Sequence, residues 1–216
     1  MIRTRQLLFL FVPAIVFAGF AVFIRYVEYH NAATPSAPAP SSEPLALVPI
    51  YPEDPIIGEK KAPLTVIGFE DFGCKGCQIQ MAMLDELQQS FPEKIKIIWK
   101  GLPVMKFPYD SHLAHEYAFC MNQEGRFDAF KNFAFANGDN LSLAVLGQSI
   151  AAAGAEQTVF EACINSPEPK QYIETIELMA QSLNIQSVPT FFIDNKQIET
   201  PQTKEAWAAL LGLSSL

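Results

Sequence analysis

Histidine and cysteine are scarce in this 216-residue chain, which contains three of the first and four of the second. Four cysteines are too few for a small fold held together by disulfides. Three histidines leave a multi-histidine metal enzyme or a Ser-His-Asp hydrolase with a weak case. Basic residues are also in deficit, because 15 Lys and Arg stand against 23 Asp and Glu and give a net charge of −8. A nucleic-acid-binding protein needs clustered Lys and Arg to displace counterions, so this class is disfavoured. Apolar residues make up 50% of the chain, enough for a sizeable core.

A long uncharged run stands near the N-terminus. Residues 7–24 are rich in Leu, Phe, Val and Ile, and Arg3 and Arg5 precede them. A secretory signal peptide has a shorter apolar core of about 7–15 residues and a small-residue cleavage site. The Ala-x-Ala pattern further along would be cut just before Pro40, which makes a poor site. The run is near the lower limit for spanning a bilayer, and positive charge before it keeps the N-terminus in the cytoplasm. We therefore expect a transmembrane anchor over 7–24, with residues 1–6 cytoplasmic and the rest exported.

A spacer is expected between the anchor and the folded part. Residues 31–44 read NAATPSAPAPSSEP and contain four prolines, a composition typical of extended linkers. We assign residues 25–47 to this linker. The remaining residues, 48–216, are expected to form one domain of ordinary size.

Short apolar runs alternate with helical patterns in this domain. The strands are expected at 64–69, 94–99, 190–193 and 196–198. The helices are expected between Gly73 and Pro92, across a block over 111–183, and over 203–211. The order is strand–helix–strand, helical block, then hairpin–helix. It predicts an α/β sandwich interrupted by a helical insertion.

Cys74 and Cys77 lie one helical turn apart, at the junction between the first strand and the first helix. Cysteines at this spacing can close a disulfide. At a helix N-terminus the free N–H groups and the helix dipole stabilise a thiolate, which is the nucleophile of disulfide exchange. Cys77, one turn deeper, can then resolve the mixed disulfide. A CxxC that follows a strand and opens a helix is much stronger than the motif alone, so we predict a redox-active pair.

Two other uses of this pair are open. His112 and His115 could complete a Cys2His2 zinc site, but the stretch from Cys77 to His112 is far longer than the spacing of a zinc finger. A purely structural disulfide would close almost no loop and so would stabilise little. The redox interpretation is favoured over both.

Four segments together resemble a known family. Residues 54–58 (DPIIG), 62–66 (APLTV) and 69–77 (FEDFGCKGC) are similar to the opening of DsbA-like thiol–disulfide oxidoreductases. More narrowly, they resemble the membrane-anchored or secreted DsbA/BdbD-type branch of the thioredoxin superfamily. Residues 187–194 (SVPTFFID) are similar to the second signature of that family. The resemblance covers residues 54–211, nearly the whole globular part.

The resemblance implies a thioredoxin fold with a helical insertion, with Cys74 and Cys77 as the redox centre and no cofactor. It also implies that Pro189 is cis and that Val188-Pro189 lies against the cysteines. Val188 would pair its main chain with an extended substrate and present it to Cys74. A proline at the start of a strand is also explained simply by its missing N–H. Family members with Val before this proline resemble oxidases, whereas members of the isomerase branch tend to have Thr at this position.

Two charged residues near the pair are singled out. The family often has a buried acid six positions before the first cysteine, where this chain has Gly68. Glu70, on the same strand face, is expected to replace that acid as a proton relay for Cys77, unless the function is missing. The ammonium of Lys75 is expected to favour the Cys74 thiolate. The alternative for Lys75 is a solvated surface lysine, whose charge water and salt screen.

Cys120 and Cys163 fall 43 positions apart in the predicted helical block. Some relatives have a second disulfide at positions that look alike, and the resemblance implies this bridge here. Two free thiols would be unusual in an exported protein. A bridge across a loop of this size would stabilise the domain by about 4 kcal/mol in the chain-entropy model.

We therefore expect a membrane-tethered oxidoreductase that forms disulfides in exported proteins, on the periplasmic or extracellular side of the cytoplasmic membrane. Its expected partners are reduced or unfolded exported proteins and a membrane quinone-linked oxidase that reoxidises it. One alternative is a reductase or isomerase of the same fold. The other is a non-catalytic, tethered binding or chaperone module.

Overall fold

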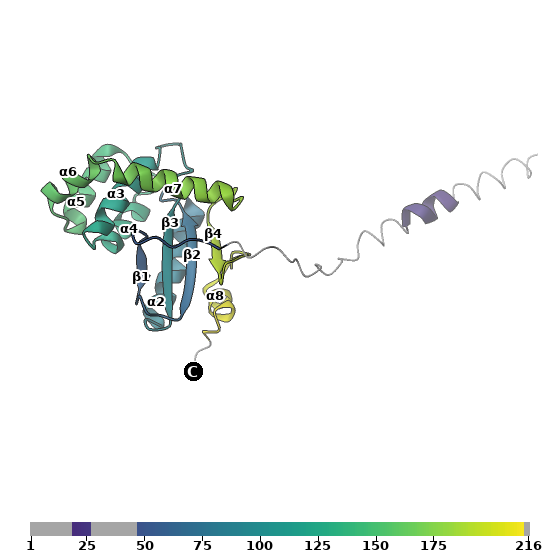
Figure 1. Cartoon of the computed structure of the whole chain (residues 1–216). Coiled ribbons are helices and arrows are strands. Elements are labelled where there is room, and N and C mark those ends of the chain that lie inside the picture. Colours follow the sequence, from purple (N-terminus) through teal and green to yellow (C-terminus); the bar gives the residue numbers. More distant parts are fainter. Residues whose placement is uncertain (1–18, 27–46, 214–216) are drawn as a thin grey trace, which may run out of the picture. The chain divides into compact units, whose positions relative to one another are not determined.

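The computed structural model describes residues 19–26 and 47–213, and the chain divides into two units, Met1–Pro44 and Leu45–Leu216 (Figure 1). In the first unit, residues 19–26 are helical. Most of the predicted span 7–24 and of the predicted linker 25–47 lies outside the described residues. Among the residues that the structure describes, none of the helices combines the length and the apolar character that crossing a bilayer requires.

A five-stranded mixed sheet forms the centre of the second unit, in the order β1-β3-β2-β4-β5 (Figure 1). The strands are β1 Ile56–Gly58, β2 Leu64–Glu70, β3 Ile95–Gly101, β4 Thr190–Ile193 and β5 Lys196–Ile198. β2 and β3 are parallel, whereas the other neighbours are antiparallel. The four predicted strands are present, and the edge strand β1 is an addition to them.

The helices follow the predicted order. They are α2 Lys75–Ser90, α3 His112–Gln123, α4 Phe127–Ala136, α5 Leu143–Ala153, α6 Gln157–Ile164, α7 Glu168–Ser182 and α8 Lys204–Leu210. The predicted helical block is thus five helices, α3 to α7. Its breaks include Gly125 and Gly154, which both have positive φ, a conformation that glycine adopts without strain. In Figure 1, α3 to α6 gather beside the sheet and α7 returns across it.

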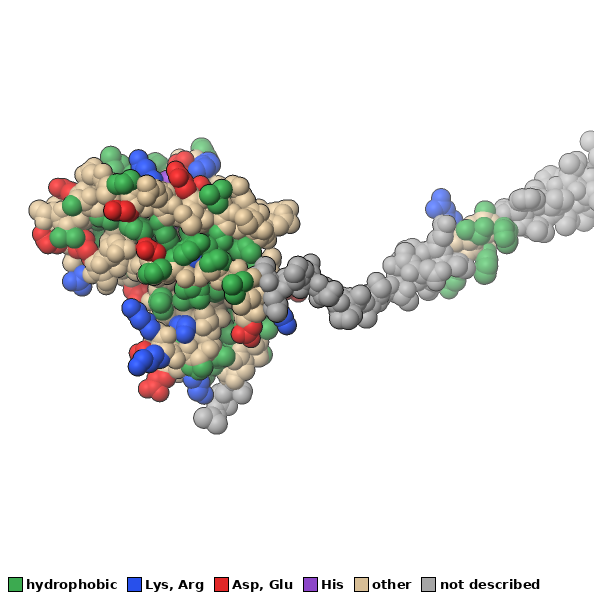
Figure 2. Space-filling model, in the orientation of Figure 1, with side chains coloured by type: hydrophobic (Ala, Val, Ile, Leu, Met, Phe, Trp, Pro, Cys, Tyr) green, Lys and Arg blue, Asp and Glu red, His purple; other side chains and the backbone are tan. Residues whose placement is uncertain are grey.

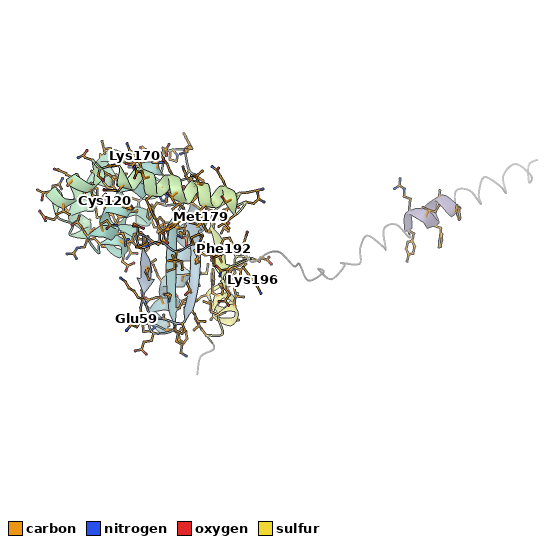
Figure 3. All side chains as sticks on the ribbon, viewed as in Figure 1. Glu59, Cys120, Lys170, Met179, Phe192 and Lys196 are labelled. Atoms are coloured by element: carbon orange, nitrogen blue, oxygen red, sulfur yellow. A yellow bond between two sulfur atoms is a disulfide. The ribbon has the colours of Figure 1, made fainter. Side chains whose placement is uncertain are left out.

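Both faces of the sheet are covered, which explains why its strands are apolar without strict alternation. On one face, the core joins Val66 and Phe191 to side chains of α2 and α8. On the other face, Ile67 and Phe192 pack with α7, whose Met179 lies near Phe192 in Figure 3. Because neighbouring residues of a strand point to opposite faces, β2 contributes to both cores. This is the predicted α/β sandwich with a helical insertion.

The face of the second unit shown in Figure 2 carries charges of both signs, and apolar side chains gather near its middle. The apolar side chains of Leu47, Ile50 and Leu178 are more than half exposed. Leu47 and Leu178 line a cavity between residues 47–51 and α7. The residues singled out by the sequence lie elsewhere, around the N-terminus of α2.

Candidate active site

Cys74 is the N-cap residue of α2, and Cys77 lies in the first helical turn. The backbone of Cys74 is extended, with φ −90° and ψ 115°, and its Sγ accepts a hydrogen bond from the N–H of Cys77 at 3.2 Å. The turn before the helix is closed by the N–H of Cys74, which donates to the carbonyl oxygen of Asp71 at 3.1 Å. Cys74 is partly exposed and Cys77 is fully buried, and both are free thiols. An incoming sulfur therefore reaches Cys74 first.

The pKa values of the two thiols move in opposite directions. The hydrogen bond with the Cys77 side chain is the largest cause that lowers the pKa of Cys74, from 9.0 to about 7, against the opposing effect of burial. Burial is the largest cause that raises the pKa of Cys77 far above its ordinary value. A thiolate is the reactive form. This geometry therefore suits Cys74 to be the nucleophile and leaving group, and Cys77 to be a thiol that must lose its proton before it reacts.

The Val188–Pro189 peptide bond is cis and lies against the cysteine pair. The Sγ of Cys74 is 3.7 Å from the carbonyl oxygen of Val188. A Cβ added to Gly76 would lie 3.4 Å from Cδ of Pro189. The structure thus brings together the two segments that the sequence singled out, and the role of Val188 in binding a substrate stays a prediction.

Glu70, the last residue of β2, is fully buried. Neither of its carboxylate oxygens has a hydrogen-bond partner among the described residues. A Cβ on Gly68 would lie 2.7 Å from Oε1 of Glu70, so this carboxylate fills the space that a side chain at position 68 would need. Burial is the largest cause that raises the pKa of Glu70, and the charge of Cys74 adds to it. The charge of Glu70 in turn raises the pKa of Cys77.

An ion pair between a buried lysine and a partly exposed aspartate lies close enough to Glu70 to affect its pKa. Nζ of Lys131, in α4, donates to both carboxylate oxygens of Asp85, in α2, at 2.6 Å. The charge of Lys131 lowers the pKa of Glu70, whereas that of Asp85 raises it. The helical insertion therefore supplies a cation to the surroundings of the redox pair. The sequence reasoning missed this lysine, because a Lys in an amphipathic helix is usually a surface residue.

Asp71 and His115 are two more buried groups. The sequence reasoning gave Asp71 no role and considered His115 only as a possible zinc ligand. The carboxylate of Asp71 is fully buried and accepts four hydrogen bonds, one of them from the N–H of Gly73 at 2.8 Å. Nε2 of His115 lies 3.5 Å from Oδ1 of Asp71, and its ring stacks on that of Trp99 with centroids 5.3 Å apart. An Asp two residues before a glycine is a common signal for a turn, so Asp71 could have been found.

Lys75 and His112 are surface groups. The ammonium of Lys75 donates to Oε1 of Gln78, and Nδ1 of His112 is 3.2 Å from Oε1 of Glu116. The influence of Lys75 on the Cys74 thiolate stays a prediction. Across residues 19–26 and 47–213, no group of three or more His, Cys, Asp or Glu could hold a metal ion.

Cys120 of α3 and Cys163 of α6 form a disulfide, with their Cα atoms 5.7 Å apart. Figure 3 labels Cys120, which lies within the helical insertion. The predicted pairing is therefore present. Because both cysteines belong to the insertion, the bridge ties two of its helices together.

Comparisons with known proteins agree with the fold described above. A family model described as thioredoxin matches residues 51–212. A periplasmic thioredoxin-like protein from Salmonella enterica serovar Typhimurium has a TM-score of 0.66, with 24% identity over 76% of this chain and 90% of its own. The thiol-disulfide exchange protein alpha-DsbA2 from Wolbachia pipientis has a TM-score of 0.65, with 18% identity over 74% of this chain and 87% of its own. At these identities the two structures show a shared fold.

One curated relative is named as a transporter and not as a thioredoxin-like protein. The Na(+)/H(+) antiporter NhaA 1 of Mycolicibacterium gilvum (strain PYR-GCK) is 26% identical over 168 residues, which are 74% of this chain but 27% of the antiporter. This chain thus spans about a quarter of the length of that relative. The match concerns one part of the antiporter and carries no transport activity over to this chain.

Proposed function

Because the chain belongs to the thioredoxin family, we propose that it is a membrane-tethered thiol–disulfide oxidoreductase that forms disulfides in exported proteins. The observation that carries the proposal is the contrast between the two cysteines. Cys74 is partly exposed and has a pKa of about 7, whereas Cys77 is buried and has a raised pKa. This is the arrangement that dithiol–disulfide exchange requires of an attacking and a resolving sulfur.

The reaction starts from the oxidised pair. A substrate thiolate attacks the Sγ of Cys74, the Cys74–Cys77 bond breaks, and Cys77 leaves as a thiolate that takes up a proton. The second substrate thiolate then attacks the substrate sulfur of the mixed disulfide, and Cys74 leaves as a thiolate. Two electrons have passed from the substrate to the pair, and the substrate has gained a disulfide. The low pKa of Cys74 favours this direction, because a thiol of low pKa leaves faster and stabilises the reduced state.

Glu70 is proposed as the group that exchanges a proton with Cys77. Its carboxyl is buried without a hydrogen-bond partner among the described residues, and its charge acts on Cys77. A buried carboxyl of raised pKa is protonated over a wider pH range than an ordinary carboxyl, and its protonated form can give a proton to the leaving Cys77 thiolate. In the opposite direction the carboxylate takes the proton back before Cys77 attacks.

Val188 is proposed to hold the substrate chain. Its carbonyl oxygen lies 3.7 Å from the Sγ of Cys74, so main-chain groups of this segment are next to the reacting sulfur. An extended polypeptide paired with this segment would present its cysteine to Cys74, as in other cases of strand addition.

The membrane tether and the partners rest on the sequence. Residues 7–24 are uncharged and follow two arginines, which supports an anchor with the domain on the periplasmic or extracellular side. Reduced or unfolded exported proteins would be the substrates. The pair must then be reoxidised, for which we propose a membrane quinone-linked oxidase that accepts the two electrons.

An oxidation assay on the full chain in detergent tests this proposal. The oxidised protein should form disulfides in a reduced, unfolded substrate, and Cys74→Ser should be inactive in the same assay. The reduction potential of the pair, measured against glutathione, should be more oxidising than that of glutathione. A more reducing pair would instead assign the reductase or isomerase direction. Binding of unfolded protein that is unaffected by Cys74→Ser, without any oxidation, would assign a chaperone module.

A further inference from the structure

The loop over residues 102–111, between β3 and α3, lies directly against the turn that carries Cys74. A Cβ added to Gly73 would lie 3.0 Å from Cβ of Met105, so the side chain of Met105 packs closely against the backbone of Gly73. The loop also contains Phe107, whose side chain is 83% exposed. The loop therefore packs against the turn that carries the reacting sulfur.

The carboxylate of Asp71 is the link between the redox turn and this loop. On the turn it accepts the N–H of Gly73 at 2.8 Å. On the loop it accepts the N–H groups of Val104 and Met105 at 2.6 and 2.7 Å, and the hydroxyl of Ser111 at 2.8 Å. The residue is fully buried, so water does not compete for these bonds. Hydrogen bonds from neutral donors to a buried carboxylate are stronger than those between neutral groups.

Asp71 also provides a negative charge that lies close enough to Cys74 to raise the pKa of its thiol. Burial alone would raise the pKa of Asp71. The nearby His115 and the N–H groups of Met105 and Gly73 overcome this and lower it to about 2, so the group is ionised at every working pH. This charge raises the pKa of Cys74, against the hydrogen bonds from Cys77 that lower it. The negative charge and the nucleophile thus repel each other inside a partly desolvated turn.

We propose that Asp71 is a positioning residue for exchange at Cys74. Its hydrogen bonds hold the redox turn against residues 104–105, and its charge opposes formation of the Cys74 thiolate. Asp71 therefore fixes the position of the redox turn and at the same time makes the Cys74–Cys77 disulfide a weaker oxidant, because the Cys74 thiolate becomes less stable. This inference rests on the proposed function of the cysteine pair.

An ultraviolet thiolate titration of the reduced full chain tests the effect of the charge. Asp71→Asn keeps the shape but removes the charge, and it should lower the pKa of Cys74 by about half a unit to one unit. The equilibrium with glutathione should then move toward the reduced pair by about three- to tenfold. The matched control is Ser111→Ala, which removes one hydrogen bond and keeps the charge, and its titration curve should superimpose on that of the wild type.

A second neutral variant covers the case in which Asp71→Asn does not fold. Asp71→Ser keeps an acceptor for the N–H of Gly73, and it should lower the pKa of Cys74 in the same way. Neutral variants that titrate like the wild type would overturn the inference. A shift in Ser111→Ala as large as that in Asp71→Asn would overturn it too, because loop geometry and not charge would then be the cause. The titration needs no substrate, so its failure leaves the oxidation assay unaffected, and a failed oxidation assay leaves the titration interpretable.

Discussion

Replacing Glu70 with glutamine should stabilise the protein at neutral pH. The carboxyl is fully buried and lacks a hydrogen-bond partner among the described residues, and burial raises its pKa well above 4.5. The folded state therefore holds a proton that the unfolded chain releases, so the free energy of unfolding falls as pH rises above 4.5 toward the pKa of the folded state. Below pH 4.5 the group is protonated in both states and this loss disappears. Glu70→Gln keeps the size of the side chain and removes the ionisation.

The pH interval limits the size of the effect. One pKa unit corresponds to about 1.4 kcal/mol, so the interval from 4.5 to pH 7 allows a gain of at most about 3.5 kcal/mol. We expect Glu70→Gln to be more stable than the wild type by about 1–3 kcal/mol at pH 7, and by much less at pH 4. Urea unfolding of both proteins across this pH range measures the difference, in which other titrating groups cancel. Glu93→Gln, an exposed carboxyl, is the control and should show no such trend.

The outcome that refutes the reasoning is a stability difference that does not change with pH. A wild type more stable than Glu70→Gln at pH 7 would also refute it, because the carboxylate would then have favourable partners in the fold. The same variant tests the proton relay, since glutamine cannot accept a proton. Resolution of a mixed disulfide by Cys77 at pH 7 should slow by about 100-fold, although the protein is more stable.

Three further perturbations concern other residues of the site and the insertion. Replacing both Cys120 and Cys163 with Ala should lower the free energy of unfolding by about 4 kcal/mol while turnover of a small substrate stays nearly unchanged; loss of activity at full stability would contradict this structural role. Lys75→Glu should raise the pKa of Cys74, more so at low salt, and coincident thiolate titrations would show that Lys75 is only a surface residue. Gly68→Ala places a methyl 2.7 Å from a buried carboxylate oxygen, and thermal unfolding should show a loss of about 1–3 kcal/mol; unchanged stability would mean that this carboxyl can move aside.

The strands, the helices and the redox pair could be predicted because their signals are local. A CxxC between a buried strand and a helix is recognisable within a dozen residues, and three of the four breaks in the helical block contain a glycine. The strand β1 was missed because it has only three residues and pairs only with β3, at the edge of the sheet. Three residues are too few to show the alternation of apolar and polar side chains that predicts a strand.

The charged groups beneath the pair could not be predicted in the same way. Lys131 reaches Asp85 across 46 positions, so its burial is a consequence of how α4 packs on α2. The interaction of Asp71 with the loop before α3 spans 33 to 40 positions. For Glu70 the strand period indicated the correct face, but the fit of its carboxylate into the space beside Gly68 needs the packed structure.

Trapping of a mixed disulfide tests the central claim, that Cys74 is the exchanging sulfur, most directly. The full-length Cys77→Ser protein, mixed with a disulfide-containing or reduced substrate under mild oxidation, should accumulate a covalent complex. Peptide mapping by mass spectrometry should place the link at Cys74, and Cys74→Ser should form no complex. A complex that forms through Cys77 in the Cys74→Ser variant would contradict the account. The absence of a complex in both variants would also contradict it, provided that glutathione still reacts with the cysteine pair of the wild type.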